Sequence, residues 1–222
     1  MDRMYRWTRH VYDVTRRPYL LGRDRLLHRL ADDLAPGPER SRIPRVLEVG
    51  CGTARNLRRL ADRAPACELY GIDASTQMLA TARQTLRRRG LYSGHGPITL
   101  AQGLAEELDP AVTLGVSGRF DAVFFSYVLS MIPTWRPALD RALQCVRPGG
   151  TLYVVDFWDQ RDWPRWVRRL LQGWLSLFGV HPRPALLEEL RALDDEGIAS
   201  LSLEPVAGRY AYLARLDVGP AA

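Results

Sequence analysis

Apolar runs alternate with helical periods along most of the chain from residue 45 onward. Short runs rich in β-branched and aromatic residues predict strands, and apolar residues at every third or fourth position predict helices. The expected strands are 45–49, 68–73, 98–103, 120–127 and 150–157. The expected helices are 53–63, 75–89, 135–146, 163–178 and 184–195. This alternation predicts an α/β fold with a parallel sheet that helices cover on both faces.

The two ends of the chain depart from this alternation. Residues 198–218 read as two strands joined around Val206–Gly208, too close together for a crossover helix, so we expect an antiparallel hairpin at the sheet edge. At the other end, one expected helix breaks at Pro18, and a second covers 23–34 and ends at the prolines and glycine of APGPER. The chain therefore divides into an N-terminal helical segment, 1–40, and one domain, 41–222.

Composition removes several classes of protein. All 31 basic residues are arginine, which excludes P-loop ATPases and Schiff-base enzymes because both need a lysine amine. Residues 1–30 hold eight arginines and three acids, whereas the rest of the chain is almost neutral. No apolar run approaches the roughly 20 residues of a membrane-spanning helix, and the charged N-terminus is unlike a signal peptide. Three cysteines without metal-ligand spacing favour a cytoplasmic protein without a metal site.

A glycine turn after the first core strand carries the clearest chemistry. Gly50 and Gly52 allow a sharp turn and a close approach to a ligand. A dinucleotide site would need a third glycine, where Arg55 stands. Glu48 would repel a pyrophosphate but suits an ammonium or sulfonium group, and Asp73, at the end of the second strand, is placed to accept hydrogen bonds from ribose hydroxyls. These residues predict a ligand with a ribose and a cationic group but no phosphate; the alternative is a strand–helix turn that binds nothing.

Four segments together resemble the motif series of class I S-adenosylmethionine-dependent methyltransferases: EVGCGT, GIDAS followed by Met78, FDAVFFSYVLSMI, and RPGGTLYVVDF, within residues 43–157. The resemblance implies a Rossmann-like fold, with a seven-stranded, mostly parallel sheet of order 3-2-1-4-5-7-6 and a C-terminal antiparallel hairpin. It implies S-adenosylmethionine as the cofactor. Leu104 stands where the family often has an acid beside the adenine amino group, so backbone groups or Glu106 are expected to substitute there. The implied cofactor contacts are Tyr19, Arg23, Glu48, Gly50, Gly52, Asp73, Ala74, Met78, Gly103, Leu104, Ala105 and Ser126.

Methyl transfer mainly requires a nucleophile aligned with the sulfonium methyl. Tyr127 and Asp156, at the ends of the fourth and fifth strands, are the candidate catalytic residues that accept a proton or a hydrogen bond, together with His10; structural polar pairing is the alternative. Aromatic side chains after these strands would face the cleft of an open sheet and stabilise a methylated ammonium group. The expected acceptor contacts are Tyr5, Tyr12, Tyr127, Met131, Trp135 and Trp158.

Residues 5–27, and GVHPRPALLEEL near the end, resemble the N-methyltransferases of betaine-lipid biosynthesis. Those enzymes convert diacylglycerylhomoserine to the trimethylated lipid by three successive methylations. The resemblance implies that 1–40 form a lid, that the substrate is a lipid with a homoserine amine head group, that the protein contacts an anionic membrane peripherally at its inner face, and that it works with a separate aminocarboxypropyl transferase. The basic, tryptophan-rich segment 163–178 either lies on a membrane surface or covers the sheet with its apolar stripe buried.

Three other functions stay open. The chain is alternatively a soluble small-molecule N- or O-methyltransferase, or a catalytically silent, cofactor-binding partner subunit. A nucleic-acid methyltransferase is the third alternative because the sequence pI is 9.6. The charge is confined to one segment, however, and the apolar FFSYVLSMI stands where a base-handling motif would follow the fourth strand, so no nucleic-acid partner is expected.

Overall fold

The computed structural model describes residues 20–35, 42–92, 96–176 and 182–219. Its strands are β1 Arg45–Val49, β2 Glu68–Asp73, β3 Ile98–Gln102, β4 Phe120–Ser126, β5 Val146–Phe157, β6 Ala199–Val206 and β7 Ala211–Val218. Its helices are α2 Arg23–Asp33, α3 Arg55–Arg63, α4 Thr76–Arg87, α5 Pro110–Leu114, α6 Trp135–Cys145, α7 Arg165–Ser176 and α8 Pro184–Asp195, with a 3-10 turn, η1, over Ala105–Glu107. The predicted alternation is present, and the short elements η1 and α5 are additional.

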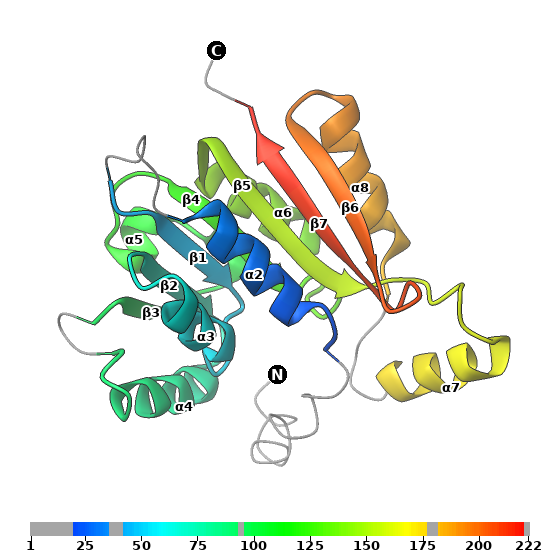
Figure 1. The fold of residues 1–222 in the computed structure, drawn as a ribbon, viewed down its shortest axis with the longest axis horizontal. Helices are drawn as coiled ribbons and strands as arrows, with labels where there is room; N and C mark the ends of the chain where they lie inside the picture. Colours follow the sequence, from blue (N-terminus) through cyan, green and yellow to red (C-terminus); the bar gives the residue numbers. More distant parts are fainter. Residues whose placement is uncertain (1–19, 36–41, 93–95, 177–181, 220–222) are drawn as a thin grey trace.

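The strands form one seven-stranded sheet in the order β3-β2-β1-β4-β5-β7-β6 (Figure 1). Neighbours from β3 to β5 pair in parallel, whereas β7 runs antiparallel to both β5 and β6. The predicted fold class, strand order and C-terminal hairpin are therefore confirmed. Chain order reverses between β1 and β4, and such a switch point leaves a crevice at the carboxyl ends of the strands.

Side chains of the central strands alternate between two apolar layers. On one face of the sheet, Val46, Phe124 and Val155 belong to a core cluster that includes buried residues of α2, α3 and α4. On the other face, Leu47 and Val154 belong to a cluster that includes buried residues of α6 and α8. Every residue of β4 is buried. This double coverage explains why these strands read as nearly continuous apolar runs.

Helix α2 lies within the segment that the sequence assigned to a lid. Its Leu26, Leu27 and Leu30 are fully buried and belong to the core cluster of the α3 face. The hydroxyl of Tyr153 in β5 also donates to the carboxylate of Asp33 at the end of α2. Helix α2 thus packs against one face of the sheet and forms part of the core. Residues 1–19 lie outside the described residues, so the lid stays a prediction for them.

Helix α7 buries its apolar stripe only in part. Leu175 is its one buried residue, whereas Trp166 is 68% exposed and Leu170 is 67% exposed. Figure 1 shows α7 beside the end of the hairpin, while α8 lies along β6. The interpretation of 163–178 as a sheet-covering helix with its whole stripe buried is wrong for Trp166 and Leu170, whereas Leu171, Trp174 and Leu175 pack against the core cluster of the α3 face. Within the described part of the chain, no helix combines the length and the apolar composition needed to cross a membrane.

Candidate cofactor and acceptor sites

The glycine turn joins β1 to α3 beside the end of β2. The backbone amides of Gly50 and Cys51 both donate to the carbonyl of Ile72 at 2.9 Å. Gly50 has a φ of +73°, and a Cβ on it would lie 2.6 Å from a methyl of Val128. Gly52 has a φ of +55°, and a Cβ on it would meet nothing within 4 Å. Gly50 therefore permits close packing against the loop after β4, whereas Gly52 leaves open space where a ligand can approach.

A cavity of about 320 Å³ opens at the carboxyl ends of the strands around this turn. Every residue predicted to contact the cofactor lines it, except Tyr19, which lies outside the described residues. Val128, Ile132 and Thr134, from the loop after β4, line it as well. The tertiary structure therefore brings together residues at the ends of β1, β2, β3 and β4 with Arg23, at the start of α2. The residues in common are Arg23, Glu48, Gly50, Gly52, Asp73, Ala74, Met78, Gly103, Leu104, Ala105 and Ser126.

Asp73 is held rigidly at the end of β2. Its Oδ2 accepts a hydrogen bond from the amide of Gly52 at 2.7 Å, and its Oδ1 accepts one from the amide of Ser75 at 2.8 Å. Burial raises the pKa of the Asp73 carboxyl, although these two hydrogen bonds act in the opposite direction. Each carboxylate oxygen can accept a second hydrogen bond. The side chain is therefore oriented as an acceptor for a pair of ligand hydroxyls.

Glu48 is a buried acid, with 1% of its surface exposed. Its Oε1 accepts a hydrogen bond from the Nδ2 of Asn56 at 2.7 Å, and its buried Oε2 has no hydrogen-bond partner among the described residues. Burial raises the pKa of Glu48 to about 8, against the opposing effects of Asn56 and of the Arg23 charge. A cation bound beside Glu48 would satisfy the unpaired oxygen and favour its ionised form. The site thus suits a cationic ligand.

Asn56 was missed by the sequence interpretation. It is a buried residue of α3, one position before Leu57 and four before Leu60, both fully buried. A single amide on the apolar stripe of a helix is the signal that would have identified it, because buried amides need partners. Here the partner is the carboxylate of Glu48, across the glycine turn.

The start of α3 adds a positive end to the cavity. Ala54, its N-cap, has a φ of 56° and makes no side-chain cap, and the first turn holds no acid. The amides at the start of a helix attract anions, and Arg23 and Arg55 also line this cavity. The cavity therefore combines a buried acid for a cation, an acceptor for ribose hydroxyls and a positive end for a carboxylate, which are the recognition needs of S-adenosylmethionine.

A family model described as "Methyltransferase domain" matches residues 47–152, which include the glycine turn, Asp73 and β4. The chain carries a class I S-adenosylmethionine-dependent methyltransferase domain. S-adenosylmethionine is its cofactor.

Relatives of the methyltransferase domain act on different acceptors. The chain is 31% identical over 146 residues to demethylmenaquinone methyltransferase of Thermus thermophilus, covering 66% of this chain and 60% of that protein. It is 30% identical over 187 residues to trans-aconitate 2-methyltransferase of Streptomyces avermitilis, covering 79% of this chain and 66% of that protein. Phosphoethanolamine N-methyltransferase 2 of Haemonchus contortus, solved with S-adenosyl-L-methionine, shares the fold with a TM-score of 0.64 at 14% identity, over 89% of this chain and 53% of that one. The chain thus spans 60% and 66% of the lengths of the two curated relatives.

Tyr127 lines the cofactor cavity of the methyltransferase domain, but its hydroxyl is already used. It donates to the carbonyl of Leu21, and its ring meets Phe157 edge-on with centroids 4.6 Å apart. Burial raises the pKa of the Tyr127 hydroxyl well above its ordinary value. A protonated hydroxyl that donates to a backbone carbonyl is not poised to accept a proton. The geometry therefore assigns Tyr127 to holding Leu21 beside the cavity, a correction to its predicted catalytic role.

Asp156 does not line the cofactor cavity. It is 1% exposed, its Oδ2 accepts from the amide of Ser130 at 2.9 Å, and its Oδ1 accepts from the amide of Phe157 at 2.8 Å. Burial raises its pKa to about 6. Its side chain ties the loop after β4 to the end of β5, and the alternation along β5 places it on the same face as Val154, where it is buried. The alternative of structural polar pairing therefore describes Asp156, and the catalytic prediction does not.

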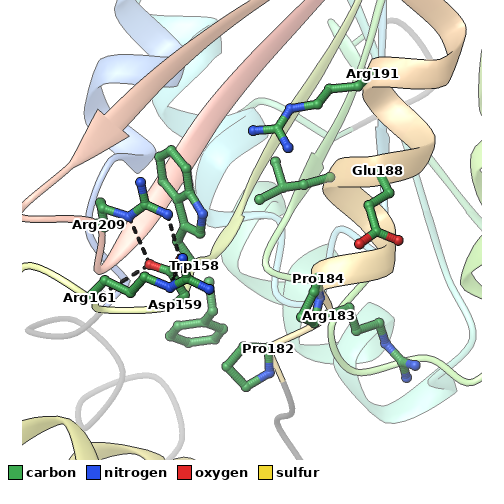
Figure 2. A pocket seen from close by; sticks show the side chains of 11 residues that line it. Trp158, Asp159, Arg161, Pro182, Arg183, Pro184, Glu188, Arg191 and Arg209 are labelled. Atoms are coloured by element: carbon green, nitrogen blue, oxygen red, sulfur yellow. Dashed lines mark hydrogen bonds and ion pairs between the residues drawn. The ribbon is translucent and has the colours of Figure 1, made fainter. Parts of the chain in front are cut away.

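Two of the predicted acceptor contacts also lie elsewhere. Trp135 is 4% exposed and belongs to the core cluster of the α6 face, because it begins α6 and packs inward. Trp158 lines a second cavity of about 320 Å³ beside the start of α8 (Figure 2). Met131 lines the cofactor cavity, and its role as an acceptor contact stays a prediction. Tyr5, Tyr12 and the alternative base His10 lie outside the described residues.

Proposed function

We propose that the chain transfers the methyl group of S-adenosylmethionine to a nitrogen or oxygen atom of a small molecule. The observation that carries this proposal is that two acids line the same cavity. Glu48 is buried with one oxygen that makes no hydrogen bond to any described residue, and Asp73 is held in place by backbone amides. The names of the two curated relatives support the substrate class, since demethylmenaquinone and trans-aconitate are small molecules.

The side chains of this cavity align reactants rather than move protons. Glu48 pairs with the cationic end of the cofactor, Arg23 and the start of α3 with its carboxylate, and Asp73 with its ribose. Met78 and Leu104 cover the adenine region. The bound cofactor supplies a methyl group on a sulfonium, a strong electrophile. With Tyr127 and Asp156 both hydrogen-bonded to the backbone, catalysis rests on proximity and orientation, which suits an acceptor that is already deprotonated.

Calorimetry and labelled methyl transfer test this proposal together. The wild-type chain should bind S-adenosylmethionine, and it should transfer label to trans-aconitate or to at least one free amino acid. Asp73→Ala should weaken this binding by at least tenfold, since a charged hydrogen bond is lost, whereas Asp62→Ala, an exposed acid on α3, should bind like wild type. Wild-type affinity in Asp73→Ala, or tighter binding of a dinucleotide than of S-adenosylmethionine, would overturn the proposal.

A second candidate function is three successive N-methylations of the homoserine lipid at an anionic membrane. The resemblance of residues 5–27 supports it, and so does the exposed face of α7. Trp166 and Leu170 are exposed there beside the exposed Arg165 and Arg169, and α7 contains no acid. Tryptophan and leucine flanked by arginine favour an anionic lipid surface, with about 1 kcal/mol from each arginine near the surface.

Sedimentation with liposomes distinguishes the two candidates. If the lipid function holds, the chain should bind anionic vesicles, lose binding as salt rises and methylate the homoserine lipid faster than soluble amines. Trp166→Glu should weaken vesicle binding, whereas Val112→Glu, on α5 and 84% exposed, is a matched control that should not. Equal vesicle binding by both variants, or better methylation of a soluble acceptor, would count against the lipid function.

A further inference from the structure

The second cavity lies beyond the end of β5, between the β6–β7 turn and α8 (Figure 2). None of its described lining residues is among the cofactor contacts described above. Trp158 and Arg209 form one wall, with the Arg209 guanidinium 4.1 Å from the centroid of the indole. Arg191 of α8 lies on the opposite side (Figure 2), and Leu187 of α8 and Phe157 also line the cavity. The cavity thus combines apolar contact area with charged ends.

Positive charge exceeds negative charge around this cavity. Four arginines line it against two acids, Asp159 and Glu188. Asp159 is shared by two of them: Arg209 donates from Nε at 2.8 Å and from Nη2 at 2.5 Å, and the Nε of Arg161 lies 3.1 Å from its Oδ2. One carboxylate between two guanidiniums leaves a net positive charge. The four arginines are Arg161, Arg183, Arg191 and Arg209.

Arg183 is incompletely satisfied at the start of α8. One of its terminal nitrogens donates to the carbonyl of Ile132 at 3.0 Å, but its Nε is buried and has no acceptor in the part of the chain that the structure describes. Arg183 is also the N-cap of α8, whose first turn contains no acid and receives no side-chain cap. A helix N-terminus attracts anions, which favours an anionic ligand at the start of α8, whereas the Arg183 guanidinium itself points away from Trp158 and Arg209 (Figure 2).

The second cavity adjoins the cofactor cavity. Ile132, whose carbonyl accepts from Arg183, lines the cofactor cavity. The ring pair of Tyr127 and Phe157 makes the same connection, because Tyr127 lines the cofactor cavity and Phe157 lines the second one. Residues that line the two cavities are therefore in direct contact, although no described residue lines both cavities.

We propose that the second cavity binds a carboxylate of the acceptor, so that the substrates are small organic acids with an apolar segment against Trp158 and Leu187. This inference rests on the proposed function, because it treats the ligand as the methyl acceptor. Both a dicarboxylic acid and a homoserine derivative carry such a carboxylate, and the shared chemistry is the same: arginine pairs with a carboxylate through two parallel hydrogen bonds.

Calorimetry with succinate and with homoserine, each beside the amide that lacks the carboxylate charge, tests the proposal. The wild-type chain should bind at least one of the acids saturably and its amide at least tenfold more weakly. Arg191→Gln and Arg161→Gln, both exposed, should weaken acid binding by roughly tenfold each, since a charged hydrogen bond is lost. Arg88→Gln, an exposed arginine at the end of α4, is the matched control and should bind like wild type. Labelled methyl transfer to each acid that binds then shows whether the carboxylate belongs to a dicarboxylic acid or to a homoserine derivative.

Three results would overturn the proposal: equal binding of acid and amide, equal losses in Arg191→Gln and Arg88→Gln, or saturable binding of neither acid. S-adenosylmethionine binding is measured on the same samples. If the variants bind the cofactor normally and the acids bind nowhere, the acceptor inference fails while the proposed function stands. If the acids bind in the second cavity and the cofactor does not bind, the proposed function fails instead.

Discussion

Ionisation of Glu48 should control the affinity for S-adenosylmethionine between pH 6 and pH 7. Because its pKa is about 8 in the free protein, the ionised fraction rises from about 1% at pH 6 to about 9% at pH 7. A cationic ligand binds beside the ionised form. An α-amino group titrates near 7.7–8.0 and stays mostly protonated in this window, which reduces the expected gain only slightly. The Kd should therefore fall about eightfold, or roughly 1.2 kcal/mol.

As the pH rises, the stability of the ligand-free protein should fall while its affinity for the cofactor rises. The pKa of Glu48 is raised in the folded state from about 4.5 to about 8, so its contribution is fully present below pH 4.5 and is lost as the pH rises through 8. A difference of this size corresponds to at most about 5 kcal/mol. Asp156, with a pKa of about 6, adds a loss of the same sign at lower pH. The difference between wild type and Glu48→Gln isolates the contribution of Glu48.

Calorimetry at constant ionic strength measures the first effect, and urea unfolding at the same pH values measures the second. Glu48→Gln should have a Kd that varies less than twofold between pH 6 and pH 7, and its stability should decline less with rising pH. Glu107→Gln, an exposed glutamate in η1, should behave like wild type in both assays. A flat Kd for wild type across this window, or the same slope in Glu48→Gln, would refute the reasoning.

The remaining predictions concern the turn and its neighbours. Gly50→Ala should lower the free energy of unfolding by about 2–4 kcal/mol, because its Cβ meets Val128 and its φ is positive. Gly52→Ala should cost only about 1–2 kcal/mol but weaken cofactor binding; equal unfolding losses in urea would contradict this distinction. Asp73→Ala should weaken cofactor binding by about 1.5–3 kcal/mol in calorimetry. Tyr127→Phe should lower the melting temperature through a loss of about 1 kcal/mol and reduce kcat by less than tenfold, whereas a hundredfold loss would restore a catalytic role.

The sequence predicted most of the fold because local patterns carry it. Continuous apolar runs such as 120–127 identify strands buried on both faces, and the close spacing of the last two strands identifies the hairpin. The short elements at 105–114 were not predicted, since one or two turns are too short for a helical period to appear. The cavity-lining positions Gly52 and Asp73 were identified because a turn at a strand end depends on residues close in sequence.

Only the tertiary structure decided where side chains after the strands point. Trp158 turns away from the cofactor cavity because its amide donates to the carbonyl of Tyr210 in the hairpin turn. The hydroxyl of Tyr127 finds its acceptor at Leu21, 106 residues earlier. Asp156 is buried and accepts from the amide of Ser130, 26 residues earlier, and α7 exposes Trp166 and Leu170 while its Leu175 is buried in the core. Periodicity sets which face of its own element a residue occupies, but the segments that meet that face come from elsewhere in the chain, and they decide between core, cavity and surface.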